Sequence, residues 1–394
     1  MFFDIKNPIN LCRKKVARTF FTVKVFAIAG ALSSWIGCSD TRHDRHSGAD
    51  KQISIEDSIV IDASSIFKLY PTTITKKNST EDSVLLILDK IASVAYKIDT
   101  DNNIYDTNAM SKALTADMIG FTINKRKIYF LSEKGVMVFS GEPNVTPKAY
   151  AFDVTDVNVN GFHTAAGEFK IMDDGSFLIC KFLNGERNTR EGFEKYFSSK
   201  IVCKAVIDEG KRYLITKDLQ DITFPIDYRK NDYNDVYPIF YTHGNNIRYV
   251  FQYWDSIGII TPEGKERYAI PKQFSVKTEP IPEGGESSKT KSDEYTSTRN
   301  ANISLLEFKD KILVFQQIGA EKYVDEETGM LNDYLSLDKR MLVFDLAKKR
   351  FEDVAYKLPP NCNPVKSCVF NNHLYLFTVD EARGKIKIYI TTLK

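Results

Sequence analysis

Residues 385–393 read Lys-Ile-Lys-Ile-Tyr-Ile-Thr-Thr-Leu, and this stretch decides the fold class. Ile386, Ile388 and Ile390 alternate with lysine and tyrosine side chains. Successive side chains of a strand point to opposite faces, so the three isoleucines would share one face. The pattern predicts a β-strand with one buried face, and helical periodicity is scarce in the rest of the chain after Ile53.

Similar strand pairs recur along the chain. Each pair consists of an apolar strand, a turn and a second strand, and the pairs occupy residues 84–98, 127–139, 175–207, 247–260, 311–345 and 373–393. Their spacing of about 43 to 70 residues, without intervening helical patterns, is typical of β-propeller blades of about four strands each. The sequence therefore predicts an all-β chain that folds as a β-propeller with six blades.

The two ends of the chain are predicted to meet in the last blade. The C-terminal unit provides only three strands, at 369–371, 373–379 and 385–393. The N-terminal segment Ile53–Asp62 also alternates and would supply the fourth strand, covering an edge that would otherwise stay unpaired. Two other architectures remain open, namely a pair of β-sandwiches and a seven-bladed ring whose additional blade lies within residues 247–311.

The N-terminus has the features of an export signal. Six Lys or Arg residues and one acid precede Cys38, and the 13 residues at 25–37 form an apolar run that is too short to span a bilayer comfortably. We predict a lipoprotein signal peptide at 1–37, a lipidated Cys38 with a polar tether at 38–51, and a single propeller domain at 52–394. An uncleaved signal anchor is the alternative.

Composition excludes some functions. Six of the 54 basic residues and one of the 52 acidic residues lie before Cys38, so the mature chain has a small negative net charge of about −3. A nucleic-acid partner is not expected, because binding phosphates needs an excess of Lys and Arg on one face. No motif indicates a metal or another cofactor. Cys180, Cys203, Cys362 and Cys368 are either two disulfides or buried thiols.

The segment 227–241 contains four tyrosines interleaved with amide and carboxylate side chains. Aromatic rings with planar polar neighbours suit sugars, which offer an apolar face and a fringe of hydroxyls. We predict that a ligand stacks on Tyr233, Tyr237 and Trp254, while Asn234 and Asp235 bind its hydroxyls. The competing interpretation is that these tyrosines cover the edges of a blade.

Several motifs resemble those of the six-bladed β-propeller lipoproteins of Bacteroidetes, a TolB-like propeller type whose members are mostly uncharacterised. The motifs are Cys-Ser-Asp at 38–40 with a polar tether, Asp-Ser-Ile at 57–59 and 255–257, Lys-Ile-Tyr-Phe at 127–130, Lys-Ile-Leu-Val-Phe at 311–315 and Met-Leu-Val-Phe-Asp at 341–345. The resemblance implies an envelope protein with a propeller and provides no transferable active site.

Two functions follow as expectations. The first is a lipid-anchored binding or scaffold module for a glycan or protein partner, located on the periplasmic or surface face of the outer membrane. The second is an envelope polysaccharide hydrolase or lyase whose acids converge in the central funnel, because carboxylates from several blades can meet there without leaving a motif.

Overall fold

A computed structural model of the chain describes residues 51–393, except 63–68, 75–83, 90–93, 99–103, 108–117, 125–126, 133, 140–146, 153–158, 164–168, 170, 184–188, 232, 234–236, 277–288, 327–328, 333 and 381–384. The predicted signal peptide, Cys38 and the tether before Lys51 lie outside the described residues. Among the described residues, no helix has the length and apolar character needed to cross a membrane.

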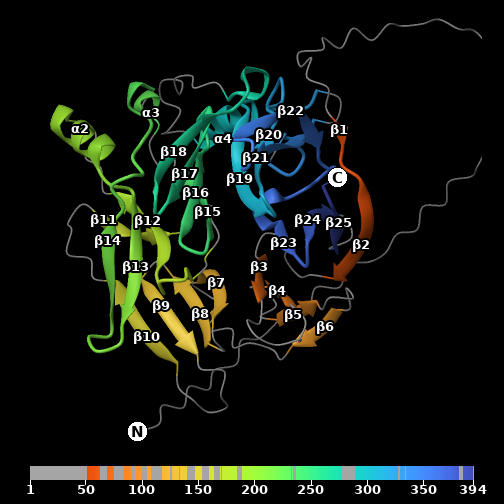
Figure 1. Cartoon of the computed structure of the whole chain (residues 1–394). Helices are drawn as coiled ribbons and strands as arrows, with labels where there is room; N and C mark the ends of the chain where they lie inside the picture. The colour runs from red at the N-terminus through yellow and green to blue at the C-terminus, as the bar shows by residue number, and fades with distance from the viewer. Residues whose placement is uncertain are drawn as a thin grey trace, which may run out of the picture. The chain divides into compact units, whose positions relative to one another are not determined.

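Four-stranded antiparallel units dominate the structure, and the described strands form six of them (Figure 1). The first three units are β3 (Leu69–Ile74), β4 (Val84–Asp89), β5 (Val94–Ile98) and β6 (Ile104–Thr107); β7 (Met118–Asn124), β8 (Lys127–Ser132), β9 (Gly135–Phe139) and β10 (Lys148–Phe152); and β11 (Val159–His163), β12 (Phe177–Leu183), β13 (Val202–Asp208) and β14 (Tyr213–Asp218). The next two are β15 (Pro238–His243), β16 (Asn246–Phe251), β17 (Ser256–Thr261) and β18 (Gly264–Ala269); and β19 (Ala301–Phe308), β20 (Lys311–Gln317), β21 (Lys339–Asp345) and β22 (Arg350–Lys357). The sixth contains β23 (Cys368–Phe370), β24 (His373–Asp380), β25 (Lys385–Thr391) and the N-terminal β2 (Ile55–Asp62).

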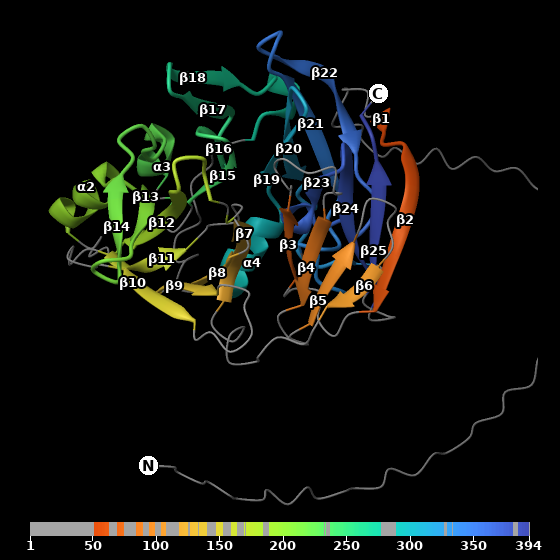
Figure 2. The same cartoon turned by 60° about the horizontal axis from the view of Figure 1, so that its bottom comes forward.

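The first strands of neighbouring units contact one another. Contacts join β15 to β19, β19 to β23, β23 to β3 and β3 to β7, and Figure 2 shows the later strands of these units lying further outward. This arrangement of repeated four-stranded sheets is a β-propeller, as the sequence predicts. The described parts of residues 247–311 complete the fourth unit and begin the fifth, and they contain no additional blade.

The N-terminal strand closes the last unit. β2 pairs antiparallel with β25, and Ile61 lies opposite Ile386. The alternating isoleucines of both strands are buried in one core with Phe377 and Val379. The predicted closing strand is therefore confirmed. In addition, β1 (Lys51–Gln52) pairs parallel with β22, so residues 51–62 contact the outer strands of both the fifth and the sixth units.

The second and third units share one sheet, which the sequence does not predict. β10 pairs parallel with β14, with Ala151 opposite Tyr213, and the result is an eight-stranded sheet. One face of this sheet carries a core that includes Tyr150, Phe177 and Leu214. Edge strands of adjacent units are thereby paired with each other and not left with free backbone groups.

Helices occur in the insertions between strands. α2 (Arg190–Ser198) begins after Thr189, whose hydroxyl accepts a hydrogen bond from the backbone N–H of Gly192 at 3.1 Å, and it buries Tyr196 and Phe197. The short α3 (Ile226–Lys230) buries Tyr228, and α4 (Lys289–Ser297) precedes β19. The four cysteines after Cys38 are free thiols, and Cys180, Cys203 and Cys362 are buried.

Candidate functional site

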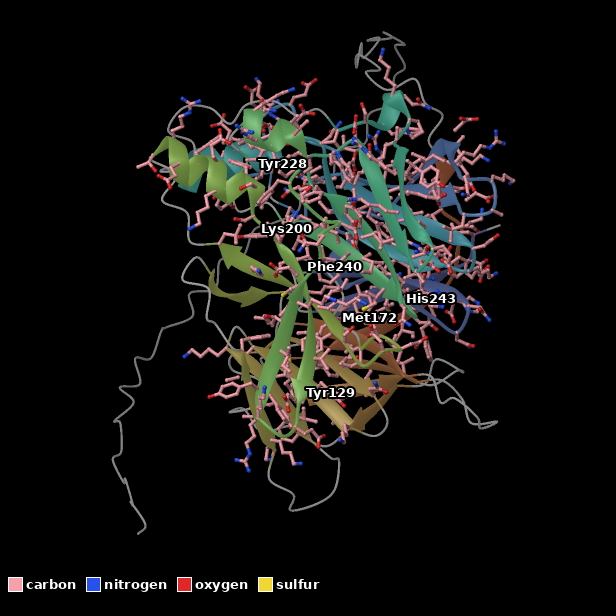
Figure 3. The ribbon with its side chains drawn as sticks, turned by 60° about the vertical axis from the view of Figure 1, so that its left-hand side comes forward. Tyr129, Met172, Lys200, Tyr228, Phe240 and His243 are labelled. Atoms are coloured by element: carbon pink, nitrogen blue, oxygen red, sulfur yellow. The ribbon has the colours of Figure 1, made fainter. Side chains whose placement is uncertain are left out.

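A charged cluster lies at the junction of the fourth and fifth units. The β15–β16 turn contains Gly244 with φ +60°, a left-handed conformation that glycine adopts without steric cost. This turn places His243 at the end of β15 and Arg248 two residues into β16. Glu307 reaches the same place from β19, whose strand packs against β15 and β16. Figure 3 labels His243.

Arg248 and Glu307 form a buried ion pair. Their side chains are each 6% exposed, and Arg248 Nε lies 3.1 Å from Glu307 Oε2. The other carboxylate oxygen, Oε1, lies 2.6 Å from Nδ1 of His243, whose side chain is 66% exposed. The carboxylate thus connects a buried guanidinium to an imidazole that solvent can reach.

The Arg248–Glu307 pair leaves hydrogen-bonding capacity unused. The distance between the charges is short, but the geometry does not align a hydrogen bond, and within the described part of the chain Arg248 Nε and Nη1 and Glu307 Oε2 have no hydrogen-bond partner. Buried charged groups are costly unless hydrogen bonds satisfy them as well as charge pairing. A water molecule or a ligand hydroxyl would supply the missing partners. The cluster is therefore suited to receive a polar group.

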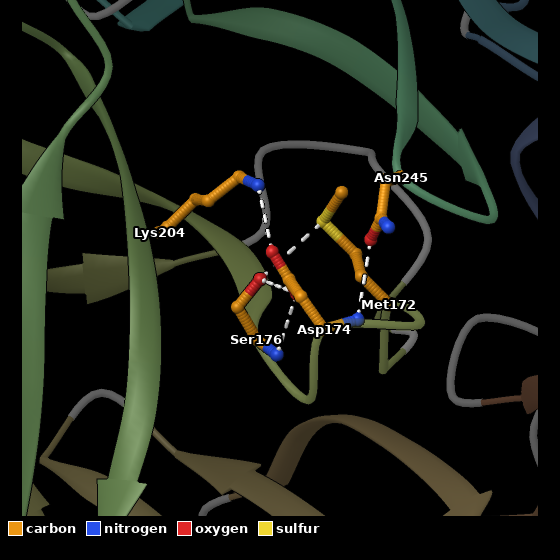
Figure 4. A network of polar contacts seen from close by, with 5 residues as sticks. All are labelled: Met172, Asp174, Ser176, Lys204 and Asn245. Atoms are coloured by element: carbon orange, nitrogen blue, oxygen red, sulfur yellow. Dashed lines mark hydrogen bonds and ion pairs between the residues drawn. The ribbon is translucent and has the colours of Figure 1, made fainter. Parts of the chain in front are cut away.

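The loop before β12 of the third unit contacts the β15–β16 turn through a network of polar side chains (Figure 4). The backbone N–H of Asp174 donates to Asn245 Oδ1 at 3.2 Å, and Lys204 Nζ lies 2.9 Å from Asp174 Oδ2. Partial burial would raise the pKa of Asp174, but hydrogen bonds from Ser176 and Lys204 lower it below the usual value, so the ionised form is favoured. These contacts fix the turn that carries His243.

The residues predicted to bind a ligand lie in one hydrophobic core. Tyr233, Tyr237 and Trp254 are all buried, whereas Asn234 and Asp235 lie outside the described residues. The Tyr233 hydroxyl is 2.8 Å from that of Tyr295. The three rings belong to one extended core but have different aromatic neighbours, with Tyr233 beside Tyr253 and Trp254 beside Tyr249. Their contact with a ligand stays a prediction.

Trp254 and Tyr237 show how these rings are held. Trp254 stacks on Tyr249 at 5.8 Å, and the guanidinium of Arg267 covers it at 4.5 Å. Tyr237 accepts a hydrogen bond from the backbone N–H of Leu183 at 3.4 Å. Burial raises the pKa of Tyr253 in the same cluster, so its hydroxyl stays neutral.

Sequence reasoning did not select Arg248, Glu307 or His243 as a site. A signal was present, because Arg248 interrupts the apolar run Ile247–Phe251 and Glu307 interrupts the apolar strand 303–308. A charged residue inside such a strand requires a partner when it is buried. The chain positions of the two residues, however, do not show that they face each other.

Other polar features are weaker candidates. A surface hollow of about 210 Å³ lies at the β21–β22 turn, but three of its five charged lining residues, Asp345, Lys348 and Glu352, already form the pairs Lys348–Asp345 and Lys311–Glu352. Among the described residues, no group of three or more His, Cys, Asp or Glu side chains is placed to hold a metal ion. The cluster of Arg248, Glu307 and His243, hereafter the Arg–Glu–His site, is the strongest candidate.

One comparison with a solved structure supports the fold. The chain matches no family model and no curated protein. A solved structure of a DUF4221 family member from Bacteroides vulgatus is 11% identical, with 87% of this chain and 98% of that chain covered and a TM-score of 0.64. An exported protein from Bacteroides fragilis is 10% identical, with 88% and 99% covered and a TM-score of 0.43. The WD40 domain of Neurospora crassa Pan2 is 11% identical, with 87% and 98% covered and a TM-score of 0.34. At 11% identity the likeness to the DUF4221 structure concerns the fold alone, and the other two likenesses carry no argument.

Proposed function

We propose that this protein is a lipid-anchored propeller of the cell envelope that binds a hydroxyl-rich ligand, a glycan, at the Arg–Glu–His site. The observation that carries the proposal is the buried Arg248–Glu307 pair with unused hydrogen-bonding atoms, next to an exposed His243. Neither the ligand class nor the anchor follows from the fold, so each needs its own experiment.

The chemistry of the site matches adjacent sugar hydroxyls. A hydroxyl donates one hydrogen bond and accepts others, the guanidinium of Arg248 only donates, and the carboxylate of Glu307 only accepts. A pair of neighbouring hydroxyls therefore matches both side chains, and it would reach the buried Arg248 Nε, Arg248 Nη1 and Glu307 Oε2 atoms once the exposed His243 ring moves aside. Hydrogen bonds to charged groups are stronger than neutral ones, and the low exposure of the pair limits competition from water.

An enzyme acting on an envelope polysaccharide is the second candidate. Glu307 Oε1 lies 2.6 Å from His243 Nδ1, and a carboxylate that orients an imidazole is a common arrangement for a general base. Asp173 provides an acid beside the same turn, because a Cβ atom built on Gly244 would lie 3.2 Å from Asp173 Oδ2. A hydrolase or lyase would use such groups to transfer protons at the glycosidic linkage or the sugar ring.

Titration calorimetry against a panel of envelope glycans tests the ligand. The whole chain should bind at least one glycan, and Glu307→Gln should weaken binding about tenfold or more, since it removes a charged acceptor. Glu266→Gln, which changes an exposed glutamate that pairs with Lys349, is the matched control and should bind like the native chain.

Glu307→Gln also leaves Arg248 without its counter-charge, so His243→Ala provides a second, exposed variant that should keep the native melting temperature. Binding by neither the native chain nor any variant, or equal binding by Glu307→Gln and the native chain, would refute the site. Mass spectrometry of the same glycans separates the two candidates, because cleavage that His243→Ala abolishes would establish the enzyme.

The anchor is tested separately. The native chain should incorporate labelled fatty acid and fractionate with membranes, and Cys38→Ala should abolish the label, because the thiol of Cys38 is the acceptor in this proposal. Continued incorporation in Cys38→Ala would contradict the lipoprotein assignment without affecting the glycan site.

A further inference from the structure

An exposed apolar face lies on the outer hairpin of the third unit. Val206 on β13 and Tyr213 and Ile215 on β14 are 44%, 51% and 50% exposed. Val206 lies directly opposite Ile215, and Tyr213 is two residues from Ile215, so all three side chains project from the same face of the hairpin. Large apolar side chains grouped on a surface indicate an interaction site more than scattered ones do.

The second unit extends this face. Ala151 of β10 lies opposite Tyr213, and Ala149 and Ala151 are both exposed. Side chains on the other face of these strands, among them Tyr150, Ala205 and Leu214, are buried in the core of the eight-stranded sheet. The apolar face thus spans three paired strands, which Figure 1 shows beside one another. We call Val206, Tyr213, Ile215, Ala149 and Ala151 the outer apolar face.

Lysine and arginine side chains border the outer apolar face at both ends. Lys217 follows Ile215 on the same side of β14, and Lys211 and Arg212 lie in the β13–β14 turn. All three are exposed, and none forms an ion pair within the described residues.

The acids of the same hairpin already have partners. Asp208 accepts hydrogen bonds from the backbone N–H groups of Gly210 and Lys211, and Glu209 and Asp218 pair with Lys127 and Lys181. Of these acids only Asp208 has no cationic partner among the described residues, so with Lys211, Arg212 and Lys217 the net charge next to the face is positive.

We infer that the outer apolar face lies on an anionic phospholipid surface. Tyrosine and aliphatic side chains can enter the boundary between headgroups and acyl chains, while the neighbouring Lys and Arg contact anionic headgroups. A bilayer fits better than a protein partner because three exposed cations against one acid give the border of the face a net positive charge, and because the face is part of a broad sheet. This inference is independent of the glycan site and of Cys38, and it concerns how the domain is oriented.

A pair of tryptophan variants tests the inference. In the whole chain, Ile215→Trp places a reporter on the face, and Ile226→Trp places one at an isoleucine of α3 that is 72% exposed. Both variants keep the same background from the two native tryptophans, Trp35 and Trp254. With vesicles of brominated phosphatidylglycerol, the added emission of Ile215→Trp should fall about twofold or more, and that of Ile226→Trp should stay unchanged.

Charge and salt supply further readouts. The quenching of Ile215→Trp should be weaker with brominated phosphatidylcholine or at high salt, because the headgroup attraction is electrostatic. Adding Lys217→Glu should also reduce it, whereas Lys272→Glu, at an exposed lysine of η2 (Lys272–Phe274), should not. Membrane attachment through the N-terminus would bring both tryptophan variants to the vesicle equally, so the comparison between them stays valid.

Equal quenching of the two tryptophan variants, or none at position 215, would overturn the inference. So would quenching that is the same with phosphatidylcholine and phosphatidylglycerol. A concentration-dependent dimer in light scattering, abolished by Ile215→Lys and accompanied by no quenching, would assign the face to a second copy of the chain instead.

Discussion

Ile61→Ala should destabilise the whole propeller, because Ile61 belongs to the N-terminal strand that closes the last unit. The side chain is 3% exposed, and it lies opposite Ile386 in the core formed by the isoleucines of β2 and β25. The change keeps the backbone hydrogen bonds of β2 and removes only side-chain packing. The change in the free energy of unfolding therefore measures how much the packing of the closing strand stabilises the propeller.

The expected loss follows from the atoms removed. Ile→Ala deletes three buried carbons, and at about 0.8 kcal/mol each this is about 2.4 kcal/mol of transfer free energy. The cavity that remains adds to this loss, so the free energy of unfolding should fall by about 3 to 4 kcal/mol. Val60→Ala is the matched control on the same strand, since Val60 is 49% exposed on the opposite face. It should cost less than about 1 kcal/mol.

Urea unfolding followed by two signals provides the assay. Far-UV circular dichroism reports on all the sheets, and the emission of Trp254, the only tryptophan after residue 37, reports on the fourth unit. With a urea dependence of about 3 kcal/mol per molar, Ile61→Ala should lower the midpoint by about 1 M in both signals. Equal midpoints for Ile61→Ala and Val60→Ala, or a shift in one signal alone, would refute a closing strand that stabilises the entire propeller.

Further predictions concern thiols, pH and a buried arginine. Burial raises the pKa of Cys203 and Cys362 to about 12. Of the four cysteines after Cys38, iodoacetamide near pH 8 should therefore reach the partly exposed Cys368 first and spare the buried Cys180, Cys203 and Cys362, and rapid native labelling of Cys203 would contradict its burial. The pKa of Asp174 is lowered in the folded state, so its contribution to stability is present above the unfolded-state pKa and is lost as pH falls through the folded-state value, below 3.8. Between about pH 6 and pH 2 the melting temperature should therefore fall less steeply for Asp174→Asn than for the native chain. Identical slopes would count against the Lys204 and Ser176 contacts. Arg340→Met removes the Nε–H group that donates a hydrogen bond to Gln316 Oε1 at 2.8 Å in a buried site. The change should lower the free energy of unfolding in urea by about 1 to 3 kcal/mol, and no loss would contradict a stabilising role for this bond.

The sequence alone was sufficient to predict the strands and the closing of the last unit by the N-terminal strand, because both depend on the local alternation of apolar and polar residues. Ile386, Ile388 and Ile390 can share a face only in a strand, and the alternation of Ile59 and Ile61 identifies a second strand with the same requirement. The pairing of β10 with β14 could not be predicted from the sequence, because backbone hydrogen bonds between edge strands leave little trace in the side chains.

Only the tertiary structure decided which side chains meet. His243 and Glu307 are 64 residues apart, and their contact depends on the register of β15 and on the packing of β19 against it. Tyr233 lies in a polar segment that local pattern assigns to the surface, yet Tyr228, Tyr253 and Tyr295 bury it. The physical reason is common to both cases: alternation determines which face a side chain takes, whereas long-range packing determines what that face meets.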